Sequence, residues 1–422
     1  MFDNSIYDDT LSALARFEFT EFGVDFKKSI IIDTAYCIGT DRASKNSIWK
    51  SLLKITAPLQ CDHFMKVFDA NRVLFTNWND RKDYNELVST ISKEVSNSNY
   101  SLIKELFKRK NRLPRLYYIR ILCMISKCNV NIKTKIYLLS RLIDYITAIE
   151  TLDKQVNGRL LKGYKYVPFN SSYGIENAIT QYLNSRGCET FHLCHGLHFS
   201  PNYLFFSVDA FNKYLISAKT VLSWGQGFVE NDKNRSNNSS TYKHVIAGNP
   251  KYPHKKIVVQ FHKKSCIVFL ARGQYDSNNE KLLDLLYRFS QTNKIDIYIK
   301  PHPTDNMGRI ETLCSSYGFT FVKDLTIKEL LSEEGKFGFA ISYESTAYFE
   351  AMYYNLICFR YSYEENESYG DFDDRFNSSS ELEEQLEKYS LFDLKKLSDM
   401  ISETLRYEIG FGINNYKSIL EK

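Results

Sequence analysis

The sequence has no apolar run of the 18–20 or so residues that a membrane-spanning helix needs. Its amino-terminal segment, MFDNSIYDDTLSALARFEF, is acidic and lacks the apolar core of a secretory signal peptide. Both absences favour a cytoplasmic protein. Cysteine pairs in Cys-x-x-Cys spacing are absent too, and the nine cysteines are scattered through apolar segments. Their odd number and spacing indicate buried free thiols rather than disulfides or a zinc site.

A strong excess of one charge is also missing. The chain carries 55 Lys and Arg against 50 Asp and Glu, a net charge of +5. This mild basic bias suits a protein that handles anions, but no dominant basic stripe predicts nucleic-acid binding. The segment 103–127 interleaves Lys and Arg with apolar residues, and Pro114 interrupts it. It is typical of a solvated helix face, with peripheral contact to an anionic membrane as the alternative.

With 422 residues, the chain is long enough for two or three domains. Short apolar runs alternate with helical patterns in two series, which is typical of parallel α/β layers. The first series consists of Ser29–Ile32, Val73–Phe75, Tyr164–Phe169, Thr190–Cys194, Thr220–Trp224 and Val245–Ala247. The second consists of Cys266–Leu270, Ile295–Ile299, Phe319–Val322, Phe337–Ser342 and Ile357–Tyr361. We therefore expect two Rossmann-like domains.

The composition also suggests where these domains begin and end. Residues 1–240 form the expected first domain, with a helical insertion at about 81–160 that is rich in Lys, Leu, Ile and Tyr. A polar linker at 231–241 leads into the second domain, 241–385. The tail, 386–422, reads as helices that pack back on the first domain.

The most specific motif is Lys300-Pro301-His302-Pro303, directly after an expected strand. Ligands of open parallel sheets bind outside the carboxyl ends of the strands. The two prolines fix the backbone on either side of His302. A lysine cation and an imidazole at this place suit a departing phosphate, because Lys300 supplies charge and His302 donates a proton or a hydrogen bond. A structural turn with an incidental histidine is the alternative.

A second motif follows the strand that ends at Ser342. Ser345 or Thr346 is placed to cap the next helix, which predicts a phosphate cradle made of hydroxyl and backbone N–H groups. Glu350, one turn further on, is a candidate to accept hydrogen bonds from ribose hydroxyls. An ordinary helix cap is the alternative, and pairing with the Lys300–Pro303 loop weakens it.

In the first half, the expected strand Thr190–Cys194 ends in His195-Gly196. Gly196 permits a tight turn, and His195 is a candidate general base for an acceptor hydroxyl. His192 and His198 flank it and raise a zinc alternative, but His192 and His195, three apart on a strand, point to opposite faces. A structural His195 is the other alternative.

Two weaker candidates complete the set. Glu176, at the start of an expected helix, is a second candidate base, although an exposed first-turn glutamate is the commoner explanation. Arg272 and Gly273 follow an expected strand and suit an anion-binding turn. No Asp-x-Asp motif stands in a strand-end loop, since Asp371-Phe-Asp-Asp374 falls in a late polar loop, so we expect neither a metal nor a cofactor.

Four motifs in a fixed order resemble one group of enzymes. They are His195-Gly196, Gly248-Asn249-Pro250, Lys300-Pro301-His302-Pro303 and Ser342–Thr346. In this order they resemble bacterial GT-B glycosyltransferases of capsule and lipopolysaccharide synthesis, especially sialyltransferases, polysialyltransferases and Kdo transferases. The similarity covers roughly residues 165–380. It implies two Rossmann-like domains facing across a cleft, a CMP-linked sugar donor and a glycan or glycolipid acceptor.

Residue by residue, the resemblance implies that His302 contacts the donor phosphate and acts as general acid. It also implies that Ser345 and Thr346 bind that phosphate. The acidic base of those families has no secure counterpart here, and Glu176 and His195 stand in for it. The chain is similar as well to CDP-glycerol and CDP-ribitol phosphotransferases of teichoic-acid synthesis.

The predicted function is therefore an inverting, metal-independent sugar transfer from a nucleotide-sugar. Phosphotransfer from a CDP-alditol is the alternative within the same chemistry. A non-catalytic nucleotide- or sugar-binding protein on this scaffold is the alternative from another class.

Overall fold

The computed structural model describes residues 5–39, 48–112, 116–194, 215–235, 242–303, 305–362 and 373–422. These residues form two compact units. The first consists of the described residues up to Lys251 together with Phe411–Lys422, and the second runs from Tyr252 to Gly410. All nine cysteines are free, and all but Cys123 are buried, as the sequence predicts.

The first unit is an α/β domain with additional helices. Its helices are α1 (Ser5–Ala13), α2 (Phe26–Gly39), α4 (Ile48–Thr56), α5 (Phe64–Asn71), α6 (Lys82–Glu94), α7 (Ile103–Leu106), α8 (Leu116–Ser126), α9 (Ile132–Val156), α10 (Gly174–Ser185), α12 (Gln226–Arg235) and α19 (Asn414–Leu420). Its strands are β1 (Thr20–Glu21), β2 (Val24–Asp25), β3 (Leu59–Cys61), β4 (Val73–Asn77), β5 (Ser98–Leu102), β6 (Phe107–Arg109), β7 (Lys165–Pro168), β8 (Glu189–Leu193), β9 (Thr220–Ser223) and β10 (Lys243–Ile246).

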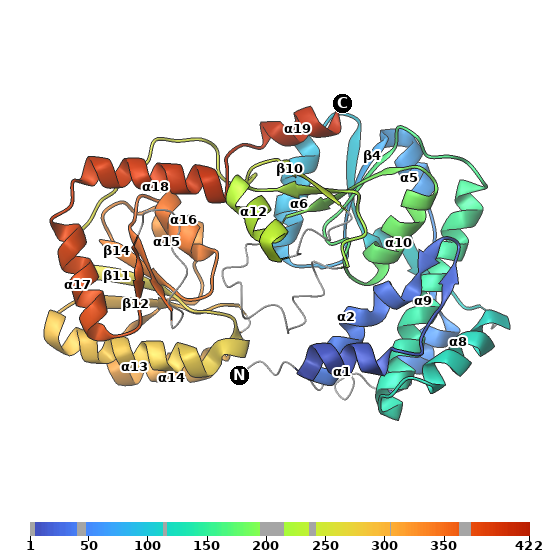
Figure 1. The fold of residues 1–422 in the computed structure, drawn as a ribbon, viewed down its shortest axis with the longest axis horizontal. Helices are drawn as coiled ribbons and strands as arrows, with labels where there is room; N and C mark the ends of the chain where they lie inside the picture. The colour runs from blue at the N-terminus through green and yellow to red at the C-terminus, as the bar shows by residue number, and fades with distance from the viewer. Residues whose placement is uncertain are drawn as a thin grey trace. The chain divides into compact units, whose positions relative to one another are not determined.

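Six of these strands form one parallel sheet in the order β10-β9-β8-β7-β4-β5. Alternate residues of a strand face opposite sides of a sheet. Accordingly, Leu74 of β4 packs into a core with α2, α9 and α10, and its neighbours Val73 and Phe75 pack into a second core with α6 and α19. Helices α2, α9 and α10 lie side by side (Figure 1).

The second unit is a regular Rossmann-like domain. Its helices are η1 (Gly273–Tyr275, a 3₁₀ turn), α13 (Asp276–Asn293), α14 (Met307–Tyr317), α15 (Ile327–Leu331), α16 (Ala347–Tyr353), α17 (Ser379–Ser390) and α18 (Leu394–Glu408). Its strands are β11 (Ser265–Phe269), β12 (Asp296–Lys300), β13 (Thr320–Phe321), β14 (Phe339–Ser342), β15 (Cys358–Tyr361) and β16 (Arg375–Phe376). They form a parallel sheet in the order β13-β12-β11-β14-β15-β16, with α13 and α14 on one side and α16 and α18 on the other (Figure 1).

The two expected series of parallel strands are confirmed apart from one segment. Ser29–Ile32, expected to be a strand, lies inside helix α2. Ser29, Ile30, Ile31 and Ile32 are all buried. A short apolar run with no alternation is compatible with a buried helix as well as with a buried strand, and here the packing against α9 and α10 decides for the helix.

The segment 81–160, expected to be a helical insertion, is not wholly helical. It begins with α6 and β5, which are regular parts of the main sheet, and continues through β6 to α8 and α9. The tail also differs from expectation, because α17 and α18 belong to the second unit and Phe411–Lys422 alone belongs to the first. There, the Lys165 ammonium donates a hydrogen bond to the carbonyl of Leu420, 2.9 Å away.

Gly248 allows the carboxyl-terminal segment Phe411–Lys422 to pack closely against the rest of the first unit. Its φ is +80°, and a Cβ atom on it would lie 2.8 Å from the backbone carbonyl of Phe411. Gly158 has a similar φ, +73°, with open space around its Cβ position. Both positions therefore disfavour L side chains, and at Gly248 alone of the two the backbone of another segment is also in the way.

We predict that Gly248→Ala destabilises the first unit by about 1–3 kcal/mol more than Gly158→Ala, because it adds a steric clash to the conformational cost that the two share. Urea unfolding followed by tryptophan fluorescence measures the difference, since Trp49, Trp78 and Trp224 all belong to this unit. Equal losses in the two variants would contradict the close approach at Phe411.

Candidate functional site

The second sheet contains a topological switch point between β11 and β14. Numbered in chain order from β11, its strands run 3-2-1-4-5-6, so the chain leaves β11 on one side and returns to β14 on the other. Phe269 of β11 lies opposite Lys300 on β12 and opposite Ser342 on β14. The loops that carry the predicted donor-site residues therefore leave three adjacent strands at the same edge of the sheet.

The loop after β11 is held rigidly at this edge. The side-chain amide of Asn279 accepts a hydrogen bond from the Ala271 N–H and donates one to the Ala271 carbonyl, both at 3.0 Å. Arg272 and Gly273 follow and begin the 3₁₀ turn η1. The amide of Asn278, in the first turn of α13, donates to the Tyr343 hydroxyl at 2.7 Å and so joins the start of this helix to the turn after β14.

His302 lies in a closed turn after β12. Its backbone N–H donates to Oδ2 of Asp305 at 2.7 Å, and its carbonyl accepts from the Asp305 N–H at 2.9 Å. Pro301 is buried, His302 is half-buried and Pro303 is exposed. The turn thus fixes the backbone at His302, as the flanking prolines predict.

Asp305 is a residue that the sequence reasoning missed. It is buried, and its Oδ1 has no hydrogen-bond partner within the described part of the chain; the same is true of Oδ1 of Asp276 at the start of α13. Burial and the nearby Asp276 raise the pKa of Asp305 to about 6, against the lowering effect of the His302 N–H. The sequence does contain a signal for this turn, because an aspartate three residues after His302 is placed to accept a hydrogen bond from the His302 backbone N–H.

The Lys300 side chain points away from the switch point. Its ammonium donates to the carbonyl of Lys323 at 2.8 Å, in the segment after β13, and burial lowers its pKa. Because β13 lies on the side of β12 away from β11, this contact directs the cation away from the switch point. A phosphate contact from Lys300 would need a different side-chain rotamer.

The turn after β14 carries the remaining predicted residues. The Ser345 hydroxyl accepts from the Ala347 N–H at 3.3 Å, and the Ser342 hydroxyl donates to the Ser345 carbonyl at 3.3 Å. Thr346 occupies the N-cap position without a side-chain capping bond. Ser345 is therefore the residue of the two that caps α16, which has only seven residues.

Glu350 is already engaged by a neighbour. The buried Tyr252 hydroxyl hydrogen-bonds to the Glu350 carboxylate, and burial together with this bond raises the pKa of Tyr252.

The first sheet has a switch point as well, between β4 and β7, where the order β5-β4-β7-β8 reverses direction. Glu176 stands in the first turn of α10, directly after β7. The Thr76 hydroxyl donates to Oε1 of Glu176 at 2.8 Å, and the Asn170 N–H lies 3.4 Å from Oε2. Glu176 is 2% exposed, and burial raises its pKa to about 8. These contacts connect β4 to the loop after β7, so Glu176 has a structural role at this point.

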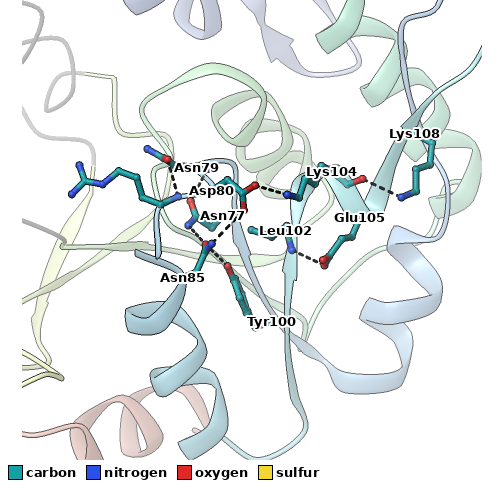
Figure 2. Close-up of polar contacts among 10 residues, drawn as sticks. Asn77, Asn79, Asp80, Asn85, Tyr100, Leu102, Lys104, Glu105 and Lys108 are labelled. Atoms are coloured by element: carbon teal, nitrogen blue, oxygen red, sulfur yellow. Dashed lines mark hydrogen bonds and ion pairs between the residues drawn. The ribbon is translucent and has the colours of Figure 1, made fainter. Parts of the chain in front are cut away.

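A network of polar side chains organises the loop after β4 (Figure 2). The Asn77 amide donates to Oδ1 of Asn85 at 2.8 Å, and Tyr100 donates to the same oxygen at 2.6 Å. Asp80 continues the network to Lys104 near the end of β5. The loop after β4, which borders the switch point, is thus held in place by side chains at the ends of β4 and β5.

Other predicted residues fall outside this geometry. His195 and Gly196, and His198 of the zinc alternative, lie outside the described residues. His192 is buried, and its Nδ1 lies 3.1 Å from the Ser171 N–H. Asp374 forms a bidentate pair with Arg360 at 2.6 and 2.8 Å.

The described ranges contain neither a cluster of metal-ligating side chains nor a membrane-spanning helix. No three His, Cys, Asp or Glu side chains gather there as metal ligands would. None of the helices in these ranges combines the length and apolar character that crossing a bilayer requires.

Glu176→Gln tests the raised pKa of Glu176. Because the folded-state pKa is raised above the ordinary value of 4.5, the native state binds more protons between pH 5 and 8, and wild-type stability is lost as pH rises through this window. We predict that the variant, uncharged at every pH, gains stability relative to wild type by up to about 1.4 kcal/mol per pH unit there. Urea unfolding at pH 5, 6.5 and 8 measures this gain, and a constant difference would contradict the raised pKa.

The sequence matches no family model and no curated protein. Similar solved structures exist at low identity. The α,α-trehalose-phosphate synthase (UDP-forming) from Burkholderia vietnamiensis is 8% identical, with a TM-score of 0.50 over 83% of this chain and 95% of that one. The lipopolysaccharide outer core galactosyltransferase WaaB is 11% identical, with a TM-score of 0.49 over 82% of this chain and 97% of that one.

A third similar chain is covered over a smaller part of its length. A chain of the GtfA/B complex is 9% identical with a TM-score of 0.44, and the alignment spans 65% of this chain and 60% of that one. At such identities the likeness concerns the fold. Together with the two six-stranded parallel sheets, the trehalose-phosphate synthase comparison shows that this chain has the two-Rossmann-domain GT-B fold.

Proposed function

We propose that this protein is a glycosyltransferase that moves a sugar from a nucleotide-sugar to a glycan or glycolipid acceptor, with inversion and without a metal. The observation that carries the proposal is the gathering of three loops at the switch point of the second sheet. These are the turn at Arg272 and Gly273, the turn at His302 and the turn at Ser345 and Thr346. Ligands of open α/β sheets bind at such points.

The residues suit a phosphate leaving group. In the reaction, the acceptor hydroxyl attacks the anomeric carbon, the bond from that carbon to the phosphate oxygen breaks, and the phosphate takes the electron pair. His302 donates a hydrogen bond or a proton to this oxygen. Hydroxyl and backbone N–H groups at Ser345 and Thr346, with the Arg272 cation, stabilise the developing charge. The short helix α16 contributes little beyond these local donors.

The donor is the finer part of the proposal. The resemblance of the motifs at 195–196, 300–303 and 342–346 to sialyl- and Kdo transferases favours a CMP-sugar. A UDP-sugar is the alternative, because the trehalose-phosphate synthase with the same fold is UDP-forming. A CDP-alditol is a third donor class, carried only by the similarity to teichoic-acid phosphotransferases. A thermal-shift panel of CMP, CDP, UDP and GDP separates these, since a ligand of the native state raises its melting temperature.

The acceptor base is assigned to His195 in preference to Glu176. Glu176 is buried, is engaged by Thr76 and Asn170, and has a pKa raised to about 8, so that most of it is protonated at neutral pH. A protonated carboxyl group does not accept the proton of an attacking hydroxyl. His195→Gln assayed beside Glu176→Gln separates the two assignments, since loss of transfer is expected in the first variant alone.

We predict that His302→Ala lowers turnover at least about 100-fold, because the departing phosphate loses its general acid. The melting temperature should change little, since the turn is closed by the backbone of His302 and the carboxylate of Asp305. Release of nucleotide from the donor selected by the panel measures turnover. The matched control is His254→Ala, an exposed histidine of the same unit, which should retain activity. Near-normal turnover of His302→Ala would overturn the assignment.

A further inference from the structure

Arg141 is a buried arginine of the first unit whose hydrogen-bonding capacity is largely unused. It lies in helix α9 and is 5% exposed. Its nearest carboxylate oxygen is Oδ2 of Asp33, 3.5 Å from Nε, and Nε is buried without a hydrogen-bond partner among the described residues. A buried guanidinium has five N–H donors and ordinarily satisfies them, because leaving them unpaired in a low dielectric is costly.

Asp33 does not need Arg141 as a close partner. Its carboxylate accepts from the hydroxyl of Tyr137 at 3.0 Å, from Tyr145 at 2.9 Å and from Tyr173 at 3.4 Å. A buried arginine–aspartate pair in the second unit is short and bidentate, since Arg360 and Asp374 meet at 2.6 and 2.8 Å. The long single contact of Arg141 therefore differs from a purely structural ion pair and leaves its fork available to a ligand.

The guanidinium borders the amino terminus of α10, a helix of twelve residues. A Cβ atom built on Gly174, the first residue of this helix, would lie 3.8 Å from Nη2 of Arg141. Gly174 is buried, and the N-cap residue Tyr173 makes no side-chain capping bond. A buried helix start without caps leaves N–H donors that water or a ligand must satisfy, and such donors favour anions.

A second cation belongs to a neighbouring helix. Lys54 of α4, a helix that packs against α9, is half-buried and has no ion-pair partner within the described ranges. Burial and the positive charge of Arg141 lower the pKa of Lys54. Arg141 and Lys54 together outweigh the single charge of Asp33, because the neighbouring Arg109 and Asp144 neutralise each other.

The site stands at the switch point of the first sheet. Trp78, in the loop directly after β4, lies with its ring 5.4 Å from the Arg141 guanidinium carbon, and α10 begins just after β7. This is the edge where an open parallel sheet binds its ligand.

We propose that Arg141, Lys54 and the amino terminus of α10 form a binding site for an oxyanion, a carboxylate or a phosphate monoester. That this anion is an acidic group of the sugar acceptor rests on the proposed transferase function; the anion site itself does not. The acceptor class that it selects is an acidic glycan or a phosphorylated glycolipid in preference to a neutral glycan.

Fluorine NMR of the 422-residue chain labelled with 5-fluorotryptophan tests the site. The three tryptophans give three resonances, and Trp78→Phe assigns the one of interest. Inorganic phosphate and acetate are titrated separately at constant ionic strength, without donor. A saturable shift of the Trp78 resonance is expected, with those of Trp49 and Trp224 unchanged. The more effective anion indicates whether the natural group is a phosphate or a carboxylate.

Variants tie the shift to the cations. Lys54→Gln removes a cation that has no ion-pair partner among the described residues, and it should weaken anion binding about fivefold. Arg141→Lys keeps a positive charge beside Asp33, so that the fold is retained, but loses the planar fork and should weaken binding at least as much. The control Lys162→Gln, an exposed lysine just before β7 and so at the opposite edge of the sheet, should leave binding unchanged.

A Trp78 resonance that does not shift saturably with either anion would overturn the proposal, as would equal affinities in wild type, Lys54→Gln and Arg141→Lys. Because no donor is present, this outcome is independent of sugar transfer. If anions bind but no donor is turned over, the transferase function fails and the anion site stands. If neutral acceptors are used as well as acidic ones by a protein that binds anions, the assignment of the anion to the acceptor fails.

Discussion

Parallel strands can be joined only by crossover connections, and in each sheet of this protein the direction of those connections reverses once. The reversal leaves a place at the carboxyl edge where two neighbouring loops diverge to opposite faces of the sheet. In the second unit this place is bordered by Phe269 and Ser342, and in the first by Asn77 and Pro168. The residues that we assign to donor and acceptor recognition follow from these two positions.

Buried polar side chains at the two sheet edges differ in how many of their polar atoms have hydrogen-bond partners. This difference separates residues with a structural role from candidates for ligand binding. Glu176 has partners for both oxygens and holds two strand ends together. Asn279 does the same for the loop after β11. Arg141 and Asp305, by contrast, each leave a buried polar atom without a hydrogen-bond partner among the described residues. A buried polar atom without a partner destabilises the folded state, so a residue that retains one is a candidate for ligand binding.

Much of the second unit could be predicted from its sequence. Its strands are short apolar runs bounded by turn residues, and each predicted loop leaves a strand where expected. The first unit was harder to predict, because Ser29–Ile32 has the composition of a buried strand but lies in the continuously buried part of a helix. Periodicity does not separate these cases, and only the neighbours α9 and α10 do.

The candidate residues show the same limit. The closed turn at His302 follows from local proline chemistry, which a sequence displays. The direction of the Lys300 side chain depends on a carbonyl in another segment, Lys323, which a sequence does not display. Arg141 belongs to none of the sequence motifs described above. Its significance comes from the distance to Asp33 and from the uncapped helix beside it, and both are tertiary facts.

The central claim is that the carboxyl edge of the second sheet, at its switch point, binds the donor nucleotide. Hydrogen–deuterium exchange of the 422-residue chain, with and without the nucleotide that stabilises it most, tests this directly. We expect protection to concentrate in peptides containing Arg272, His302 and Ser345, with no change at Ser265 and Asp296, where β11 and β12 begin. Protection confined to the amino edge of that sheet, or to the first unit alone, would contradict the account.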